Sequence, residues 1–155
     1  MKAEIREEFW HALEKSPYVM ISLRGTGAVH AEPMTVMLDR DARHTVWFFT
    51  SKQNRIAGGG RAMAQFASKG HDVFACLSGS LSTETNPAIR DKHWSKMVES
   101  WFPGGKNDPN LLMLRFEIDD AEVWTADLGI VGTFKMLTGQ TVKTSEMGEH
   151  ERGLV

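Results

Sequence analysis

The chain lacks most features that mark secreted, membrane or charge-driven nucleic-acid-binding proteins. Its single cysteine, Cys76, excludes an intramolecular disulfide and therefore a disulfide-stabilised scaffold. The 18 basic and 20 acidic side chains leave a net charge of −2, which creates no broad field to attract phosphate backbones. Residues 1–8 are too charged for a signal peptide, and no apolar run approaches membrane-spanning length. We therefore expect a soluble, cytoplasmic protein that binds neither nucleic acid nor membranes.

Motifs for self-contained catalysis are also missing. No G-x-G-x-x-G follows a predicted strand, and Gly104-Gly105-Lys106 is followed by Asn107 instead of Ser or Thr, so neither a Rossmann site nor a Walker loop is indicated. The six histidines form no H-x-x-x-H pair and have no partner cysteines, so we expect no metal site. Cys76 lies in a strand-like alternation and is interpreted as a small buried side chain. The sequence identifies no catalytic residue.

The composition is that of one globular domain. Of 155 residues, 41% are hydrophobic and 25% are charged, a mixture that excludes a disordered chain. No internal repeat or linker divides the sequence. Because the end of the chain is polar and has little periodicity, we expect a single domain over residues 1–139 and a mobile tail over 140–155.

Local periodicity predicts a mainly β domain with flanking helices. Ile5, Phe9 and Leu13 recur at helical spacing, and Ser16-Pro17 ends this first helix because the residue before a proline avoids helical geometry. Alternating apolar residues predict strands over 19–23, 73–81 and 112–118. A glycine-containing turn leads into a second strand over 29–38, and a run rich in strand-forming residues predicts a third over 45–50. Short turns join the first three strands, which favours antiparallel pairing. We therefore expect a small antiparallel barrel with helices outside it, an α+β fold.

Two further helices are expected between the later strands. The segment 54–68 carries Ile56, Met63 and Phe66, and its triplet 58–60 predicts a bend or a late start, because three glycines cost about 2–3 kcal/mol relative to alanines. Asn86-Pro87 predicts the start of another helix, which runs to about Trp101.

A series of segments in a fixed order gives a more specific indication. The segments are Glu32-Pro33-Met34, Trp47-Phe48-Phe49-Thr50, Ser51-Lys52-Gln53-Asn54-Arg55, Leu77-Ser78-Gly79-Ser80, Trp101-Phe102-Pro103-Gly104-Gly105-Lys106-Asn107-Asp108-Pro109 and Ala121-Glu122-Val123-Trp124. This series resembles the general stress protein branch of the pyridoxamine 5′-phosphate oxidase-like proteins, which are FMN-binding split barrels. The resemblance covers residues 9–139, and its most specific part is the segment 101–109.

The resemblance implies an antiparallel split β-barrel of the FMN-binding type and a homodimer with two flavins at the subunit interface. The isoalloxazine ring is then expected along the second and third strands, near Met34, Thr35 and Phe49. Trp101 and Trp124 are expected to cover the ring, one of them from the partner subunit. Taken alone, Met34 and Phe49 are explained equally well as barrel core.

The flavin phosphate is expected to reach Thr50 and the loop that carries Lys52, Asn54 and Arg55. A dianionic phosphate needs cations and N–H donors, and a basic loop can supply both. Without the resemblance, Lys52 and Arg55 would be interpreted as solvated loop charges.

Two positions depart from the family pattern. The family usually has arginine before Pro-Met, where this chain has Glu32, and Ser-x-Lys where this chain has Asn54 and Ile56. Losing one charge-assisted hydrogen bond costs about 1.5–3 kcal/mol. A carboxylate about 6 Å from a phosphate charge adds about 3 kcal/mol of repulsion at an effective dielectric of ~20. Three outcomes stay open: Glu32 turns away, Arg55 and Lys52 compensate, or the natural ligand is not FMN.

Three functional interpretations follow. The first is an FMN-binding protein of the general stress type that acts as a flavin-dependent oxidoreductase on an unknown substrate. The second is a non-catalytic dimeric stress or sensor module in which FMN binding is weakened or lost. The third is the same barrel with haem or a deazaflavin. The chain lacks the basic, histidine-containing C-terminal segment of true pyridoxamine 5′-phosphate oxidases, so we expect no vitamin B6 oxidase activity.

Overall fold

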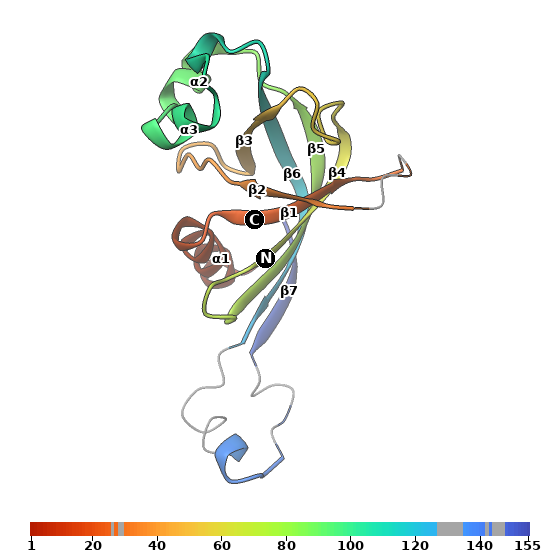
Figure 1. Cartoon of the computed structure of the whole chain (residues 1–155). Helices are drawn as coiled ribbons and strands as arrows, with labels where there is room; N and C mark the ends of the chain where they lie inside the picture. Colours follow the sequence, from red (N-terminus) through yellow and green to blue (C-terminus); the bar gives the residue numbers. More distant parts are fainter. Residues whose placement is uncertain (26, 28–29, 127–134, 142, 144–147) are drawn as a thin grey trace.

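One strongly curved antiparallel sheet forms the body of the computed structural model (Figure 1). The structure describes residues 1–25, 27, 30–126, 135–141, 143 and 148–155. The strands are β1 (Tyr18–Leu23), β2 (Glu32–Thr35), β3 (Thr45–Ser51), β4 (Gly60–Ala67), β5 (Val73–Thr83), β6 (Leu111–Thr125) and β7 (Glu149–Gly153). The helices are α1 (Ala3–Lys15), α2 (Pro87–His93), α3 (Lys96–Trp101) and the short 3-10 turn η1 (Gly105–Asn107). None of the described helices is long and apolar enough to cross a membrane.

The sheet closes on itself at a single described point. Its strand order is β2-β1-β4-β5-β6-β3, so β2 and β3 are the two ends. These ends meet at the bridge between Met37 and Trp47, where each N–H donates to the other residue's carbonyl oxygen, at 2.8 and 3.1 Å. The remainder of the two strands is unpaired along this edge in the described part of the chain. The predicted fold, an antiparallel split barrel with flanking helices, is confirmed.

The barrel interior is filled from α1 and from alternate residues of the strands. Ile5, Phe9 and Leu13, the predicted apolar face of α1, are all buried in this main core. Val19 and Ile21 of β1 meet them from the sheet. The helix ends at Lys15, before the Ser16-Pro17 step, as predicted.

A second apolar cluster lies on the opposite face of β3 and β6, where α3 and the segment after it pack. It consists of Trp47, Phe49, Val98, Phe102 and Met113. Because β3 has core on both faces, every residue from 45 to 50 is buried. Figure 1 shows α2 and α3 beside β3 at one end of the sheet and β7 at the other.

The predicted helix over 54–68 is wrong, because most of that segment is β4. Ala62, Ala64 and Phe66 alternate as buried residues, which is the two-residue period of a strand. Alanine is a poor strand former and a weak hydrophobic marker, so this alternation was hidden behind the larger Met63, which faces outward.

Other boundaries also differ from prediction. The second strand is confirmed only over Glu32–Thr35, and residue 29 lies outside the described residues. The single helix predicted after Asn86 is two helices. Asn86 caps the first by accepting a hydrogen bond from the Ala88 N–H at 3.0 Å, and Ser95 starts the second by accepting one from the Val98 N–H at 3.2 Å.

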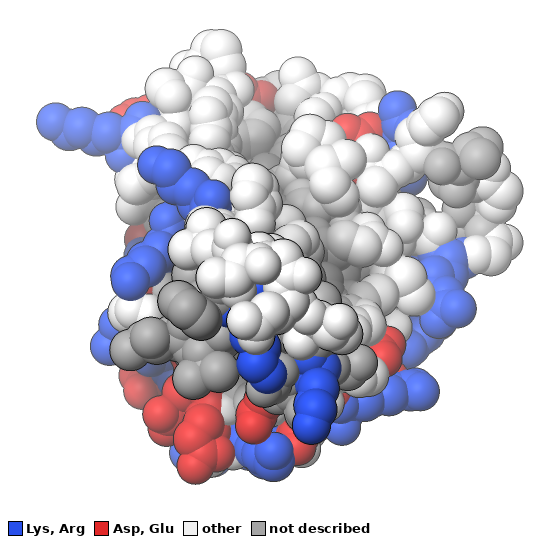
Figure 2. Space-filling view, turned by 90° about the horizontal axis from the view of Figure 1, so that it is seen from below, with Lys and Arg blue, Asp and Glu red and all other residues white. Residues whose placement is uncertain are grey.

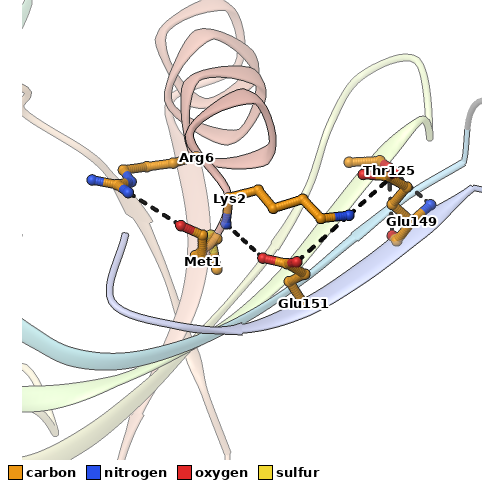
Figure 3. A network of polar contacts seen from close by, with 6 residues as sticks. All are labelled: Met1, Lys2, Arg6, Thr125, Glu149 and Glu151. Carbon is orange, nitrogen blue, oxygen red and sulfur yellow. Dashed lines mark hydrogen bonds and ion pairs between the residues drawn. The ribbon is translucent and has the colours of Figure 1, made fainter.

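The end of the chain is ordered where the sequence predicts mobility within 140–155. Glu149–Gly153 forms β7 and pairs with β6, and Val155 is buried in the main core. Figure 3 shows how the start of the chain holds this strand. The Lys2 N–H donates to Glu151 at 2.6 Å, and the Lys2 ammonium lies 3.6 Å from Glu149. Because these contacts join residues far apart in the chain, the local pattern of this polar segment did not predict β7.

Charges of both signs are interspersed on the surface. On the face seen in Figure 2, acidic and basic side chains lie next to one another along the rim. Ion pairs such as Arg152–Asp120, at 2.6 Å, join them in the structure.

Candidate functional site

The gap between β2 and β3 brings together four residues that the sequence assigned to a flavin. Beyond the Met37–Trp47 bridge, the same antiparallel register would set Thr35 opposite Phe49 and Met34 opposite Thr50. No bridge joins these pairs in the described structure. We call this unpaired stretch of the two strands, formed by residues 34–35 and 49–50, the β2–β3 split.

Main-chain groups face into this split. In an antiparallel ladder every second residue directs its N–H and C=O to the same edge. Met37 and Trp47 direct theirs toward each other, so Thr35 and Phe49 direct theirs into the split. The intervening Val36 points the other way and donates its N–H to the Pro17 carbonyl at 2.7 Å. A polar ligand could satisfy the exposed groups of Thr35 and Phe49.

The side chains at the split are largely packed within the chain. Met34 is 7% exposed and belongs to the main core, and Phe49 is 6% exposed in the second cluster. The Phe49 ring meets the Trp94 ring edge to face at 5.7 Å. The core interpretation of both side chains is therefore confirmed, and a ligand would meet these residues mainly through the backbone.

An ion pair lies at the β2 end of the split, opposite the bridge. The Arg55 Nε lies 2.6 Å from Glu32 Oε1, and Arg55 also donates to the His30 carbonyl at 3.4 Å. The Glu32 side chain is 23% exposed and the Arg55 side chain 46%. Glu32 is therefore partly exposed and forms an ion pair with Arg55, the cation that the sequence assigned to the phosphate.

The basic loop is divided between two places. Lys52 lines a separate hollow of about 240 Å³ between the ends of β5 and β6 and the start of α2. Its N–H donates to the Asn110 carbonyl at 2.9 Å, which holds this part of the loop beside β6. Asn54 accepts a hydrogen bond from the Ile56 N–H at 3.0 Å and so shapes the turn itself. Within one chain, Lys52 therefore lines the hollow beside α2, whereas Arg55 contacts Glu32 at the end of the split.

The hollow beside Lys52 has its own charge network. Arg90 and Lys106 also line it, together with Glu84 and Asp108. The Lys106 ammonium lies 3.1 Å from Asp91 and lowers the pKa of that carboxyl.

The two tryptophans assigned to the ring lie elsewhere in the chain. Trp101 is on α3 with its side chain partly in solvent. Trp124 stacks on the His150 ring, with centroids 4.9 Å apart and planes at 9°. Trp124 on β6 is four strand spacings from Thr35 on β2, roughly 19 Å across the sheet at about 4.8 Å per strand. The Trp124 side chain of the same chain therefore does not adjoin the split.

An exposed apolar face of the sheet was missed by the sequence reasoning. Tyr18, Met20, Phe74 and Trp124 are between 38% and 62% exposed. Tyr18 lies opposite Thr35, and Phe74 opposite Trp124, so this face adjoins the split at one side. The sequence did contain a sign of this face. β1 carries apolar residues at both alternating sets of positions, whereas a strand with one face in solvent usually has polar residues at one set.

Other chemistry is sparse in the described residues. They contain no group of three or more His, Cys, Asp and Glu that could hold a metal ion. Burial raises the pKa of the Cys76 thiol, which favours its protonated form and supports a structural role.

Comparisons with known proteins identify relatives over nearly the whole chain. Residues 4–147 match the family model described as pyridoxamine 5′-phosphate oxidase like. A crystal structure of the general stress FMN/FAD binding protein from Xanthomonas citri is similar, with 44% identity, coverage of 80% of this chain and 90% of that one, and a TM-score of 0.74. A general stress protein 26 from Jannaschia sp. CCS1 is similar over 99% of both chains, with 28% identity and a TM-score of 0.80.

A curated relative matches over a shorter length. General stress protein 26 of Bacillus subtilis is 34% identical over 55 residues, which are 36% of this chain and 39% of that protein. The suspected resemblance to the general stress branch is confirmed by these matches together.

Proposed function

Because the chain belongs to the pyridoxamine 5′-phosphate oxidase-like family, we propose that it is a flavin-binding protein of the general stress type, with its flavin in the β2–β3 split. The observation that carries this proposal is the split itself. It aligns Met34 and Thr35 of β2 with Phe49 and Thr50 of β3, where the main-chain groups of the two strands are not paired with each other in the described structure. The 44% identical Xanthomonas protein, which is described as FMN/FAD binding, supports the choice of ligand.

The residues present fit the ring of a flavin better than its phosphate. Thr35 and Phe49 offer N–H donors and carbonyl acceptors to the polar edge of a planar ring, and the strand edges orient it. Arg55 is the cation at the end of the split, but Glu32 already holds it. When bound, the flavin would supply hydride or electron transfer, and the protein would supply the slot and its electrostatics.

The proposed assembly is a homodimer. The face formed by Tyr18, Met20, Phe74 and Trp124 exposes four large apolar side chains on a sheet, and exposed apolar patches mark interaction surfaces. A second copy on this face would also explain how Trp124 could reach a ring at the split. Trp101 is assigned to ring contact on the resemblance alone.

As an enzyme, the protein would be a cytoplasmic FMN-dependent oxidoreductase with an unidentified substrate. The split contains no unpaired acid or base among its described residues, so proton transfer by the chain is not part of the proposal. A second candidate is a non-catalytic dimeric sensor that holds flavin weakly. The Glu32–Arg55 ion pair favours it, because the pair reduces the attraction for a phosphate.

The direct test is the colour of the purified protein. We expect absorption in the flavin bands, release of flavin on denaturation, and saturable binding of added FMN or FAD to the emptied protein. Bleaching of the bound flavin by NAD(P)H would support the oxidoreductase, whereas a flavin that no reductant reaches would support the sensor. A colourless protein that ignores both added flavins would overturn the proposal.

A further inference from the structure

We infer that the chain has a second ligand site, separate from the β2–β3 split, which takes a small aromatic anion such as an aromatic carboxylate. The site is a hollow of about 520 Å³ between α1 and the loop that joins β2 to β3, and we call it the α1 hollow. Small-molecule sites in proteins usually enclose about 300–1,000 Å³, so the α1 hollow has room for such a ligand.

The α1 hollow and the split lie on opposite sides of the Met37–Trp47 bridge. The split continues from this bridge along the strands, whereas Leu38 and His44, which line the hollow, lie on the loop side of it. In Figure 1 this loop lies between α1 and the pair of helices α2 and α3. The bridge therefore separates the two sites, and the inference does not depend on a flavin in the split.

Two residues that line the α1 hollow each carry a buried polar atom without a hydrogen-bond partner in the described structure. These atoms are Arg6 Nε and His44 Nδ1. Buried polar groups in folded proteins are nearly always paired with protein, water or a ligand. Because the two atoms belong to different elements on either side of one hollow, they point to a shared partner that the chain does not supply.

The backbone holds His44 in an unusual conformation. Its φ is +65°, in the left-handed region that favours glycine. The His44 carbonyl accepts a hydrogen bond from the Ile118 N–H at 2.7 Å, which fixes the end of the loop against β6. Strained positions of this kind cluster at ligand sites, so a histidine here favours a role for its imidazole.

Two acidic side chains at the hollow are already neutralised. Arg40 donates two hydrogen bonds to Glu14, at 2.8 and 2.9 Å, which joins the loop to α1. Lys92 pairs with Asp39 and joins the loop to α2. These pairs close the rim of the hollow and leave its remaining charges to a ligand.

The remaining charges favour an anion. Arg6 and Arg43 line the hollow as cations, and Glu7 is the remaining acidic residue that lines it. None of the three forms an ion pair within the described part of the chain. A guanidinium has five N–H donors, and Arg6 uses one of them on the Met1 carbonyl at 3.2 Å, so others can bind a carboxylate.

The apolar part of the hollow suits a planar molecule. Trp10 and Leu38 are partly buried against the main core, and Val155 is buried in it. The Trp10 ring meets the Phe9 ring edge to face at 5.0 Å, which orients it. Arg6 and Trp10 are four residues apart on α1 and therefore neighbours on one face of the helix. An aromatic ring packed on Trp10 would place its anionic group within reach of Arg6.

The test is a titration of the full chain with 2-naphthoate, an aromatic carboxylate, and with 2-naphthamide, its neutral analogue of the same shape. Isothermal titration measures the affinity before and after saturation with FMN, and the NMR signal of the Trp10 indole N–H locates the bound probe. Arg6→Gln removes the cation, and His44→Asn removes the imidazole but keeps a residue that tolerates left-handed backbone. Arg24→Gln is the matched control, because Arg24 is exposed and does not line the hollow. Circular dichroism reports whether each variant folds.

We expect 2-naphthoate to bind about tenfold more tightly than 2-naphthamide, because only the carboxylate forms charge-assisted hydrogen bonds. Arg6→Gln should weaken the binding of 2-naphthoate by about tenfold or more, and His44→Asn by about two- to tenfold. Arg24→Gln and saturation with FMN should leave this affinity unchanged. The Trp10 indole signal should shift with 2-naphthoate in the wild-type protein.

Four results would overturn the inference. They are equal binding of the two probes, binding of 2-naphthoate that neither Arg6→Gln nor His44→Asn weakens, a Trp10 signal that does not move, and no binding at millimolar concentrations, which would leave water as the partner of the two unpaired atoms. If Arg6→Gln does not fold, His44→Asn and the neutral probe decide. Competition between FMN and 2-naphthoate would place the probe in the split and overturn the second site while supporting flavin binding.

Discussion

β3 and β7 lie one after the other along the same edge of β6, and they differ in what their own free edges face. β3 pairs with the first half of β6 and β7 with the second half. The free edge of β3 faces β2 across the split, joined to it only by the Met37–Trp47 bridge in the described structure. β7 pairs with β6 along the main chain and is also held by side chains, since Arg152 forms an ion pair with Asp120 and His150 a hydrogen bond with Glu122, each at 2.6 Å.

This difference separates a binding edge from a structural one. The free edge of β3 faces a second strand, β2, across the split, whereas the side chains of β7 contact those of β6. The Glu32–Arg55 ion pair joins the start of β2 to the loop after β3 and lies at the end of the split. The predictions below test this contrast, from the largest expected effect to the smallest.

The largest effect should come from removing the packing behind the bridge. Trp47 is buried in the second cluster, with the Arg115 guanidinium 5.9 Å above its ring. Trp47→Ala should lower the free energy of unfolding by about 3–5 kcal/mol, measured by urea denaturation. The control Trp101→Ala removes a partly exposed ring and should cost less than about 1 kcal/mol. Equal losses would show that the closed end of the split does not depend on this cluster.

The next effect concerns which cation, Arg55 or Lys52, binds the flavin phosphate. Arg55→Ala removes the charge-assisted hydrogen bond and leaves Glu32 without its counter-ion, so binding of FMN and FAD should weaken by about 10- to 150-fold. Riboflavin, which has no phosphate, should bind nearly as before. Lys52→Ala is the control, and isothermal titration should detect little change. A larger loss with Lys52→Ala would move the phosphate to the 240 Å³ hollow.

How much of this the sequence predicts depends on the kind of signal each element carries. α1, β1, β3 and β5 contain large apolar residues at the right period, so their positions were predicted. β4 was missed because its buried positions include Ala62 and Ala64, which carry little hydrophobic signal. β7 was missed because it is polar and is held by distant partners such as Asp120.

The candidate site was predicted in part for a similar reason. Residues 34–35 and 49–50 lie on regular strands, so their alignment across the split follows from strand order and register. Lys52 and Arg55 lie on a turn, and neighbours on a turn can point to different surroundings. The Glu32–Arg55 pair could not be predicted, because it depends on how that turn meets β2.

A change of assembly should leave stability almost untouched. Phe74→Lys places a charge on the exposed apolar face and should convert the proposed dimer into a monomer, observed by light scattering coupled to size-exclusion chromatography. Met97→Lys changes a somewhat more exposed apolar residue on α3 and should leave the dimer intact. A dimer that survives Phe74→Lys would place the subunit interface on another surface.

The smallest effect is the pH dependence of stability that the Arg152–Asp120 pair between β7 and β6 should cause. The Arg152 guanidinium lowers the pKa of Asp120 below its usual 3.8. This pair therefore stabilises the folded state above pH 3.8, and the contribution is lost as the pH falls through the lower folded-state value. Arg152→Gln should flatten this part of the curve of thermal midpoint against pH. A curve identical to that of the wild type would show that β7 is held without this pair.

The most direct test of the central claim is backbone amide hydrogen exchange at the split, measured by NMR with and without flavin. The account predicts that saturating flavin slows exchange at the Thr35 and Phe49 N–H groups, while the amides of β7 are unchanged. Protection around Lys52 and Arg90 instead, with Thr35 and Phe49 unaffected, would contradict it.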